Sequence, residues 1–82
     1  MSITIYTKDG CPWCADALAL LREKGVSFTE KECRNNQANF DELVKKSGQT
    51  LTPTLDIDGE ILADSDAPAI AAFLKVKGVE GF

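Results

Sequence analysis

Hydrophobic and polar residues follow two different periods along this chain, and each change of period marks a new secondary-structure element. The β-prone run at residues 2–7 predicts a buried strand that ends at the turn residues Asp9 and Gly10. Over residues 11–24 the apolar side chains recur at helical spacing, and Gly25 is a suitable C-terminal cap. The chain therefore begins with a strand followed by a helix.

The same succession of strand and helix comes next. Apolar and polar residues alternate from Val26, which predicts a second strand over residues 26–33. Asn35 or Asn36 is predicted to cap a second helix, which ends at Ser47-Gly48. Because strands joined by a helical crossover run parallel, we expect the second strand to lie beside the first.

The last third of the chain predicts a hairpin and a final helix. Residues 54–57 form the third predicted strand, the Asp-Gly pair at 58–59 a two-residue turn, and residues 60–63 the returning strand. Ser65 is predicted to cap the last helix, which ends at Gly78. The predicted order is βαβαββα, an α/β fold. Apolar positions assigned to the last helix are Ile70, Phe73, Leu74 and Val76.

Composition and charge narrow the class of protein. With 82 residues, 44% of them hydrophobic and 27% charged, we expect residues 1–82 to form one globular domain. The net charge of −4 provides no basic surface, so we expect neither nucleic acid nor an anionic membrane as a partner. No apolar stretch approaches 18 residues and no leader pattern precedes the first strand, so we expect a cytoplasmic protein.

Two of the three cysteines lie at the start of the first predicted helix, three positions apart. A helix N-terminus favours the thiolate, which is the nucleophilic form, and Lys8 just upstream adds a positive charge. Pro12 suits the first helical turn, and the spacing brings Cys14 onto the same face as Cys11, within disulfide reach. The pattern predicts that Cys11 attacks a disulfide and Cys14 resolves the product.

Other interpretations of these residues are weaker or remain open. A zinc site is disfavoured because the chain has no histidine and only Cys33 as a further thiol. Cys33 itself is best interpreted as a small core residue, with a regulatory thiol as the alternative. Trp13 either stacks on a bound thiol peptide or is a partly buried hydrophobe. Taken alone, Lys8 is a solvated charge and Pro53 the first residue of a strand.

Seven motifs spread over the whole chain resemble those of the glutaredoxins, a family of the thioredoxin superfamily. Two cysteines separated by two residues are by themselves also typical of zinc sites, but the combination with a later proline in the right place is specific. The resemblance implies a thioredoxin-like fold, with a four-stranded mixed sheet flanked by three helices. The motifs are residues 6–8, 11–14, 24–28, 47–48, 52–53, 58–59 and 65–66.

The resemblance also implies a glutathione site. In that family a lysine matching Lys8 holds the glycyl carboxylate, sometimes helped by a residue at the position of Gln49. The proline matching Pro53 is cis and faces the cysteines, and the residue before it, here Thr52, pairs with glutathione through its backbone. The γ-glutamyl end lies at the N-terminus of the last helix, a natural carboxylate site. The implied set is Lys8, Trp13, Gln49, Thr52, Pro53, Ser65 and Asp66.

The chain departs from the family pattern on one side of this site. Ala63 and Asp64 stand where two glycines are usual, and Ala67 stands where a second acid is usual. Thr52 replaces the usual valine. Replacing glycine removes backbone freedom, and the negative charge of Asp64 is expected to repel a carboxylate of glutathione.

We therefore expect a small dithiol-disulfide oxidoreductase that reduces protein disulfides or glutathione mixed disulfides through Cys11 and Cys14. Its expected partners are glutathione, as reductant or co-substrate, and disulfide-containing proteins; we expect a monomer and no bound metal. One alternative is a glutathione-independent, glutaredoxin-like thioredoxin that is reduced by thioredoxin reductase. Another is an iron–sulfur carrier in which Cys11 of two subunits and two glutathiones hold the cluster.

Overall fold

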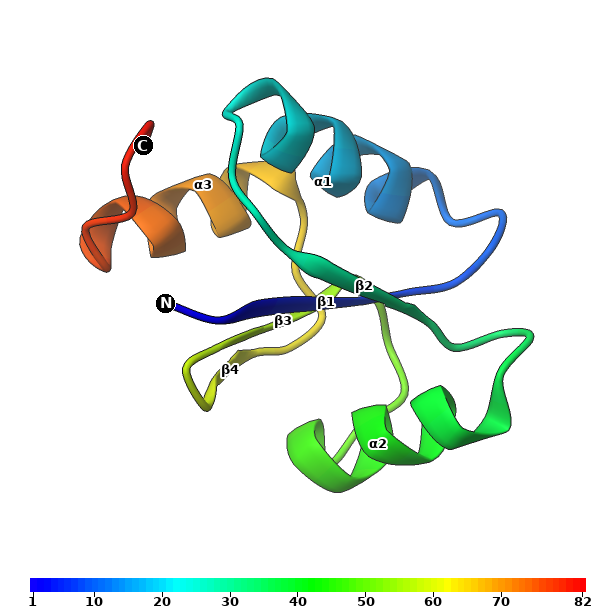
Figure 1. The fold of residues 1–82 in the computed structure, drawn as a ribbon. Helices are drawn as coiled ribbons and strands as arrows, with labels where there is room; N and C mark the ends of the chain where they lie inside the picture. Colours follow the sequence, from blue (N-terminus) through cyan, green and yellow to red (C-terminus); the bar gives the residue numbers. More distant parts are fainter.

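Residues 1–82, all of which the computed structural model describes, form four strands and three helices in the order βαβαββα. Helices α1 and α3 lie on one face of the sheet and α2 covers the other (Figure 1). The predicted order of elements is confirmed. The strands are β1 (Ile3–Thr7), β2 (Thr29–Glu32), β3 (Thr54–Ile57) and β4 (Glu60–Leu62), and the helices are α1 (Pro12–Glu23), α2 (Gln37–Ser47) and α3 (Ala67–Val76).

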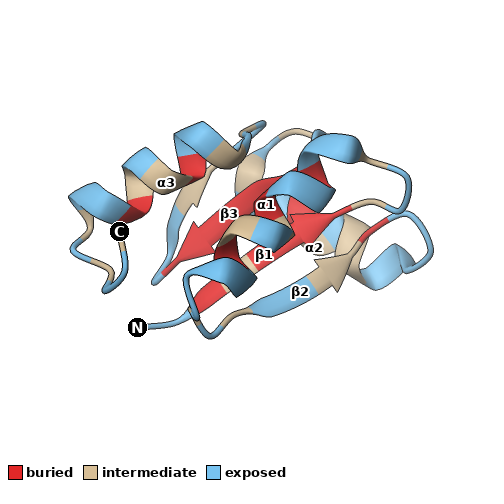
Figure 2. Ribbon diagram, turned by 90° about the horizontal axis from the view of Figure 1, so that it is seen from above, coloured by how far each residue is buried: buried red, intermediate tan, exposed pale blue.

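The strands form one mixed sheet in the order β2-β1-β3-β4. The crossover through α1 makes β2 parallel to β1, with Tyr6 opposite Lys31, as predicted. Strand β3 is antiparallel to both β1 and β4. Asp58 and Gly59 have φ angles of 50° and 92°, the left-handed conformation that a two-residue hairpin turn requires. The central strands β1 and β3 are the most buried, as Figure 2 shows.

Each face of the sheet packs against helices through its own apolar cluster. On the face of α1 and α3, the side chains of Ile5, Leu21 and Leu74 are among those fully removed from solvent. On the face of α2, Tyr6 packs with Leu43 and Cys33. Neighbouring residues of β1 thus pack into different clusters, Ile5 into the first and Tyr6 into the second, because successive side chains of a strand point to opposite faces of the sheet.

Helix caps confirm one prediction and correct another. Asn36 caps α2, since its side-chain oxygen accepts the backbone N–H of Asn39 at 3.1 Å. The expectation that Ser65 caps α3 is wrong. Asp66 is the cap, because it stands three residues before Ala69 and accepts that residue's N–H at 2.9 Å.

Some predicted boundaries and one predicted core position also need correction. Strand β2 begins only at Thr29, because β1 offers partners just for residues 29–32. Strand β4 ends at Leu62, so Ala63 lies outside it. Val76 is 85% exposed. It lies two residues after buried Leu74, which places it on the opposite side of a helix with 3.6 residues per turn.

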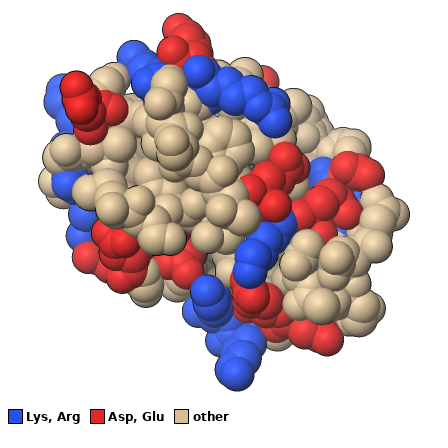
Figure 3. Space-filling model, in the orientation of Figure 1, with Lys and Arg blue, Asp and Glu red and all other residues tan.

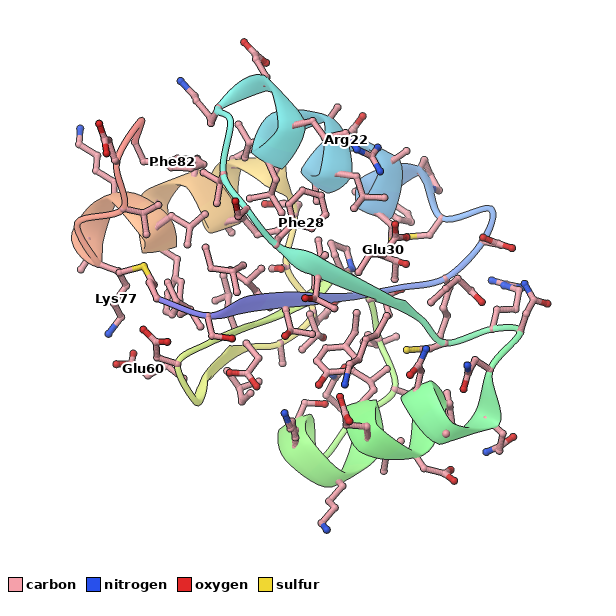
Figure 4. All side chains as sticks on the ribbon, in the orientation of Figure 1. Arg22, Phe28, Glu30, Glu60, Lys77 and Phe82 are labelled. Carbon is pink, nitrogen blue, oxygen red and sulfur yellow. The ribbon has the colours of Figure 1, made fainter.

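Charged side chains form contacts between elements at the surface of the protein. On the face seen in Figure 3, positive and negative side chains are interspersed, and neither charge forms a broad patch. The guanidinium carbon of Arg22, on α1, lies 6.0 Å from the centroid of the Phe28 ring, and its Nη2 lies 4.0 Å from Glu30 Oε1 (Figure 4). Lys77 after α3 pairs with Glu60 of the hairpin. Such exposed pairs contribute little to stability. None of the helices has the length and apolar content needed to cross a membrane.

The contrast between Leu74 and Val76 on one helix provides a test of this packing. Leu74→Ala should lower the free energy of unfolding by about 2 to 5 kcal/mol, because it leaves a cavity between α3 and the sheet. Val76→Ala, at an exposed site of the same helix, should change it by less than about 0.5 kcal/mol. Denaturant unfolding followed by circular dichroism measures both. Equal effects would contradict the assignment of the core.

Candidate functional site

Cys11 occupies the N-cap position of α1 and is half-buried. The backbone N–H of Cys11 donates to the Lys8 carbonyl oxygen at 3.1 Å, which closes a turn through Gly10, whose φ is 82°. The Cys11 Sγ accepts the backbone N–H of Cys14 at 3.2 Å. Pro12 begins the helix, as predicted from its missing N–H. A sulfur atom thus takes the place of the usual capping oxygen.

The two thiols differ in the stability of their charged forms. Burial raises the pKa of Cys11, but hydrogen bonds from the Cys14 thiol and N–H, and from Thr52, outweigh it and hold that pKa below 9.0. Burial, and then the hydrogen bond with Cys11, raise the pKa of Cys14 to about 11. The half-buried thiol of Cys11 is therefore the better nucleophile, and the buried thiol of Cys14 keeps its proton.

The loop before β3 brings Thr52 against the Cys11 sulfur. The Thr52 carbonyl oxygen and its Oγ1 each lie 3.9 Å from Cys11 Sγ. The Thr52-Pro53 peptide bond is cis, as the resemblance implied, and Pro53 is buried. Both the backbone N–H and the hydroxyl of Ser65 donate to the Pro53 carbonyl oxygen at 2.9 Å. Ser65 therefore holds this loop in place.

A hollow of about 250 Å³ opens beside this loop. It is bounded by three segments: the start of α1, the loop before β3, and the segment that leads into α3. Trp13 is 61% exposed and Leu51 51% exposed, so the hollow has two accessible apolar side chains. The lining residues are Trp13, Leu51, Thr52, Asp64, Ser65 and Asp66.

Lys8, predicted for the same site, faces a different hollow. Its Nζ donates to the Thr50 carbonyl oxygen at 2.6 Å and lies 5.8 Å from the centroid of the Phe40 ring. The second hollow, about 320 Å³, is lined by Lys8, Cys33, Arg34, Gln37 and Phe40. Lys8 is therefore separated from the four predicted glutathione-binding residues that line the first hollow, which are Trp13, Thr52, Ser65 and Asp66.

Gln49 lines neither hollow. Its Nε2 donates to the Ser47 hydroxyl at 2.8 Å and to Thr54 Oγ1 at 3.1 Å. Its Oε1 accepts the backbone N–H of Leu51 at 2.6 Å. Both polar ends of this side chain thus organise the loop that carries Thr52, and its role in binding glutathione stays a prediction.

Four lining residues were not predicted from the sequence: Arg34, Gln37, Phe40 and Leu51. Gln37 and Phe40 are three positions apart on α2, which places them on one helix face. Leu51 directly precedes Thr52, so its apolar side chain next to Thr52-Pro53 could have identified it from the sequence as a residue of the site. Nothing in the sequence pattern singled out Arg34.

Cys33 packs in the core and not at the reactive site. It is 3% exposed, lies against Tyr6 and Leu43, and directs its thiol to the Lys31 carbonyl oxygen at 3.4 Å. Burial, and then the charge of Glu32, raise the pKa of this thiol. The interpretation of Cys33 as a core residue is confirmed.

Glu32 anchors the turn that precedes Cys11. Its carboxylate accepts the backbone N–H groups of Asp9, Arg34 and Asn35, each at 2.8 Å. The Asn35 side chain donates to the Asp9 carboxylate at 2.7 Å, which closes the link. Although burial raises its pKa, the bonds from these N–H groups hold the pKa of Glu32 below 4.5.

No group of three or more Cys, Asp or Glu side chains comes together to hold a metal ion within the chain. The iron–sulfur alternative requires two copies and glutathione, so it stays a prediction.

Known proteins share this fold and a stretch of sequence that includes Cys11, Cys14 and Thr52. The Glutaredoxin family model matches residues 3–62. Glutaredoxin 3 of Escherichia coli K12 is 43% identical over 65 residues, which cover 79% of this chain and 78% of the relative. The solution structure of glutaredoxin from Brucella melitensis is 31% identical, with a TM-score of 0.67, and the match covers 95% of this chain and 82% of that one.

A crystal structure of a thioredoxin-like protein has a TM-score of 0.80 at 27% identity, covering 89% of this chain and 100% of that one. These similarities confirm the predicted thioredoxin-like fold.

The contact between Thr52 and Cys11 predicts a change in thiol reactivity. Thr52→Val removes a hydrogen bond to the thiolate, so the pKa of Cys11 should rise and its alkylation by iodoacetamide at pH 7 should slow roughly twofold. Mass spectrometry of the alkylated peptide measures the rate over a range of pH. Thr29→Val, at an exposed position of β2, should leave the dependence of the alkylation rate on pH, the pH profile, unchanged. An unaltered profile for Thr52→Val would contradict the assigned contact.

The anchoring by Glu32 predicts a pH-dependent stability. Since the pKa of Glu32 is lower in the folded state, its ionised form stabilises the fold above pH 4.5, and this contribution is lost as the pH falls through the folded pKa. Glu32→Gln should therefore be less stable than the wild type at pH 7, with a difference that shrinks below pH 4.5.

Urea unfolding at a series of pH values measures this difference. Glu23→Gln at the exposed end of α1 is the matched control. A difference that stays constant across the pH series would show that ionisation of Glu32 does not stabilise the turn.

Proposed function

Since the chain belongs to the glutaredoxin family and is a thiol-disulfide oxidoreductase, we propose that Cys11 and Cys14 carry out the exchange with glutathione as reductant. One observation carries this proposal. The half-exposed thiol that caps α1 has a lowered pKa, whereas its buried neighbour has a pKa of about 11. This arrangement separates an attacking thiol from a resolving thiol.

The reaction is a two-electron exchange in two steps. The Cys11 thiolate attacks one sulfur of a substrate disulfide, forming a mixed disulfide and releasing the other substrate sulfur as a thiol. Cys14 then loses its proton and attacks Cys11 Sγ, which releases the second substrate thiol and leaves a Cys11–Cys14 disulfide. The negative charge of Cys11 helps to raise the pKa of Cys14. Once Cys11 is in a mixed disulfide that charge is gone, so Cys14 ionises more readily.

Glutathione is proposed to lie along the hollow beside Cys11. Trp13 and Thr52 form one wall, and the start of α3 with Ser65 and Asp66 forms the other. The backbone N–H groups of Asp66 and Ala67 donate to no acceptor within the protein, as expected for the first turn of a helix. Such free N–H groups bind carboxylates, which supports the placement of the γ-glutamyl end there. Lys8, Gln49 and Pro53 complete the proposed set.

A second candidate is favoured by the charges in this hollow. Asp64 lines it and no basic side chain does, which opposes a ligand that carries two carboxylates. The protein then serves as a glutaredoxin-like thioredoxin that is regenerated by thioredoxin reductase. In either case we propose a monomer that acts in the cytoplasm on disulfide-containing proteins, independently of nucleic acid, membranes or a bound metal.

Substitution of each thiol tests the proposed mechanism. Cys11→Ser should abolish reduction of both insulin and a glutathione mixed disulfide, by at least about a thousandfold, because the nucleophile is lost. Cys14→Ser should lose insulin reduction but retain activity on the glutathione mixed disulfide, because a second glutathione can replace the resolving thiol. Cys33→Ser, in the core, is the control and should keep both activities. Full turnover by Cys11→Ser would overturn the mechanism.

The same assay, run with each reductase system, identifies the reductant. If glutathione with glutathione reductase sustains turnover, glutathione dependence is supported. If only thioredoxin reductase does so, the second candidate replaces the first.

A further inference from the structure

The hollow beside Cys11 has an acidic rim over an apolar wall. Asp64 and Asp66 both line it, together with the exposed side chains of Trp13 and Leu51. Neither carboxylate lies within 4 Å of a lysine or arginine nitrogen. The reactive thiol marks this hollow as the substrate side, since Thr52, another lining residue, contacts Cys11 Sγ.

The carboxylate of Asp64 makes no contact that stabilises the fold. It accepts no hydrogen bond, and its backbone has a φ of 47°, a conformation in which glycine is favoured. Asp58 provides a comparison within the same chain. Its φ is 50°, but its carboxylate accepts the backbone N–H of Ser2 at 2.7 Å and so ties the hairpin to the N-terminus. Asp64 has an equally unusual backbone conformation, and its charge lies in the hollow that Thr52 also lines, without such a partner.

Asp66 and Trp13 also make the hollow suited to a long basic side chain. One carboxylate oxygen of Asp66 caps α3, while the other accepts no hydrogen bond within the protein. The indole of Trp13 is 61% exposed and can contact the stem or the charged end of a long basic side chain. The basic residues Lys8 and Arg34 line a different hollow, and neither of them pairs with Asp64 or Asp66.

We propose that this groove selects protein disulfides in which a lysine or arginine flanks the attacked cysteine, and that Asp64 is the specificity-determining residue. The proposal rests on the proposed function and deepens it. The basic side chain lies along Trp13 and Leu51, with its cation near Asp64, while Cys11 attacks the adjacent sulfur. The chemical step is the exchange described above, in which the protein dithiol is oxidised and the substrate disulfide is reduced to two thiols.

Three peptide disulfides test this selection. Each is a homodimer of an acetylated and amidated five-residue peptide with a central cysteine, flanked on both sides by lysine, glutamine or glutamate. The pre-reduced protein is mixed with each peptide disulfide in single turnover, and release of peptide thiol is followed by chromatography. The second-order rate constants then report the preference directly, without a reductase or glutathione.

For the wild type we expect the lysine probe to react about threefold to fivefold faster than the glutamine probe, and the glutamate probe to be slower by a similar factor. Asp64→Asn should reduce the ratio of the lysine-probe rate to the glutamate-probe rate by about fivefold. Asparagine tolerates the left-handed backbone, so this variant keeps the fold. Glu23→Gln removes the same charge at the far end of α1 and should retain the wild-type ratio.

Equal rates for the lysine and glutamate probes in the wild type would overturn the inference. An equal loss of preference in Asp64→Asn and Glu23→Gln would also overturn it, because that result assigns the preference to net charge alone. Failure of the proposed function has a different signature. In that case no probe reacts faster with the wild type than with Cys11→Ser.

Discussion

The hydrogen bond from the Cys14 backbone N–H to the Cys11 sulfur is the contact on which the site depends. It makes the Cys11 sulfur part of the helix boundary, so the same geometry that begins α1 also stabilises a thiolate. The buried position of Cys14 follows from this, since one helical turn carries the chain from the surface towards the apolar cluster between α1, α3 and the sheet. The unequal pKa values of the two thiols are thus a consequence of where α1 begins.

The second half of the site is held by polar contacts from distant parts of the chain. Ser65 binds the Pro53 carbonyl oxygen, Gln49 bridges its own loop, and Lys8 donates to Thr50. These contacts hold Thr52 against Cys11 Sγ, while Glu32 holds the turn on the opposite side. Together these hydrogen bonds keep the Cys11 thiol in one environment. A lowered pKa of this thiol depends on such a fixed environment.

The charges around the thiol are unevenly distributed. Lys8 and Arg34 line one depression, whereas Asp64 and Asp66 line the other. Opposite charges at two ends of a binding surface orient a partner and discriminate among partners more than they add affinity. In this family member, Asp64 stands where a glycine is usual, and it adds a carboxylate to the hollow that is also lined by Thr52, the residue in contact with Cys11 Sγ.

The sequence alone determined the order of elements, the hairpin at Asp58-Gly59 and the position of Cys11 at the start of a helix, because each depends on local periodicity, turn chemistry or a helix start. The helix cap at Asp66 was missed, since Ser65 and Asp66 are equally suited to capping and Ser65 is instead recruited by Pro53. Exposure of Val76 was missed because its apolar character did not reveal which side of α3 meets the sheet. Only the tertiary structure separated Lys8 from Ser65 and Asp66, and engaged Gln49 within its own loop. The positions of these side chains depend on contacts between residues far apart in the chain, which the local sequence pattern does not reveal.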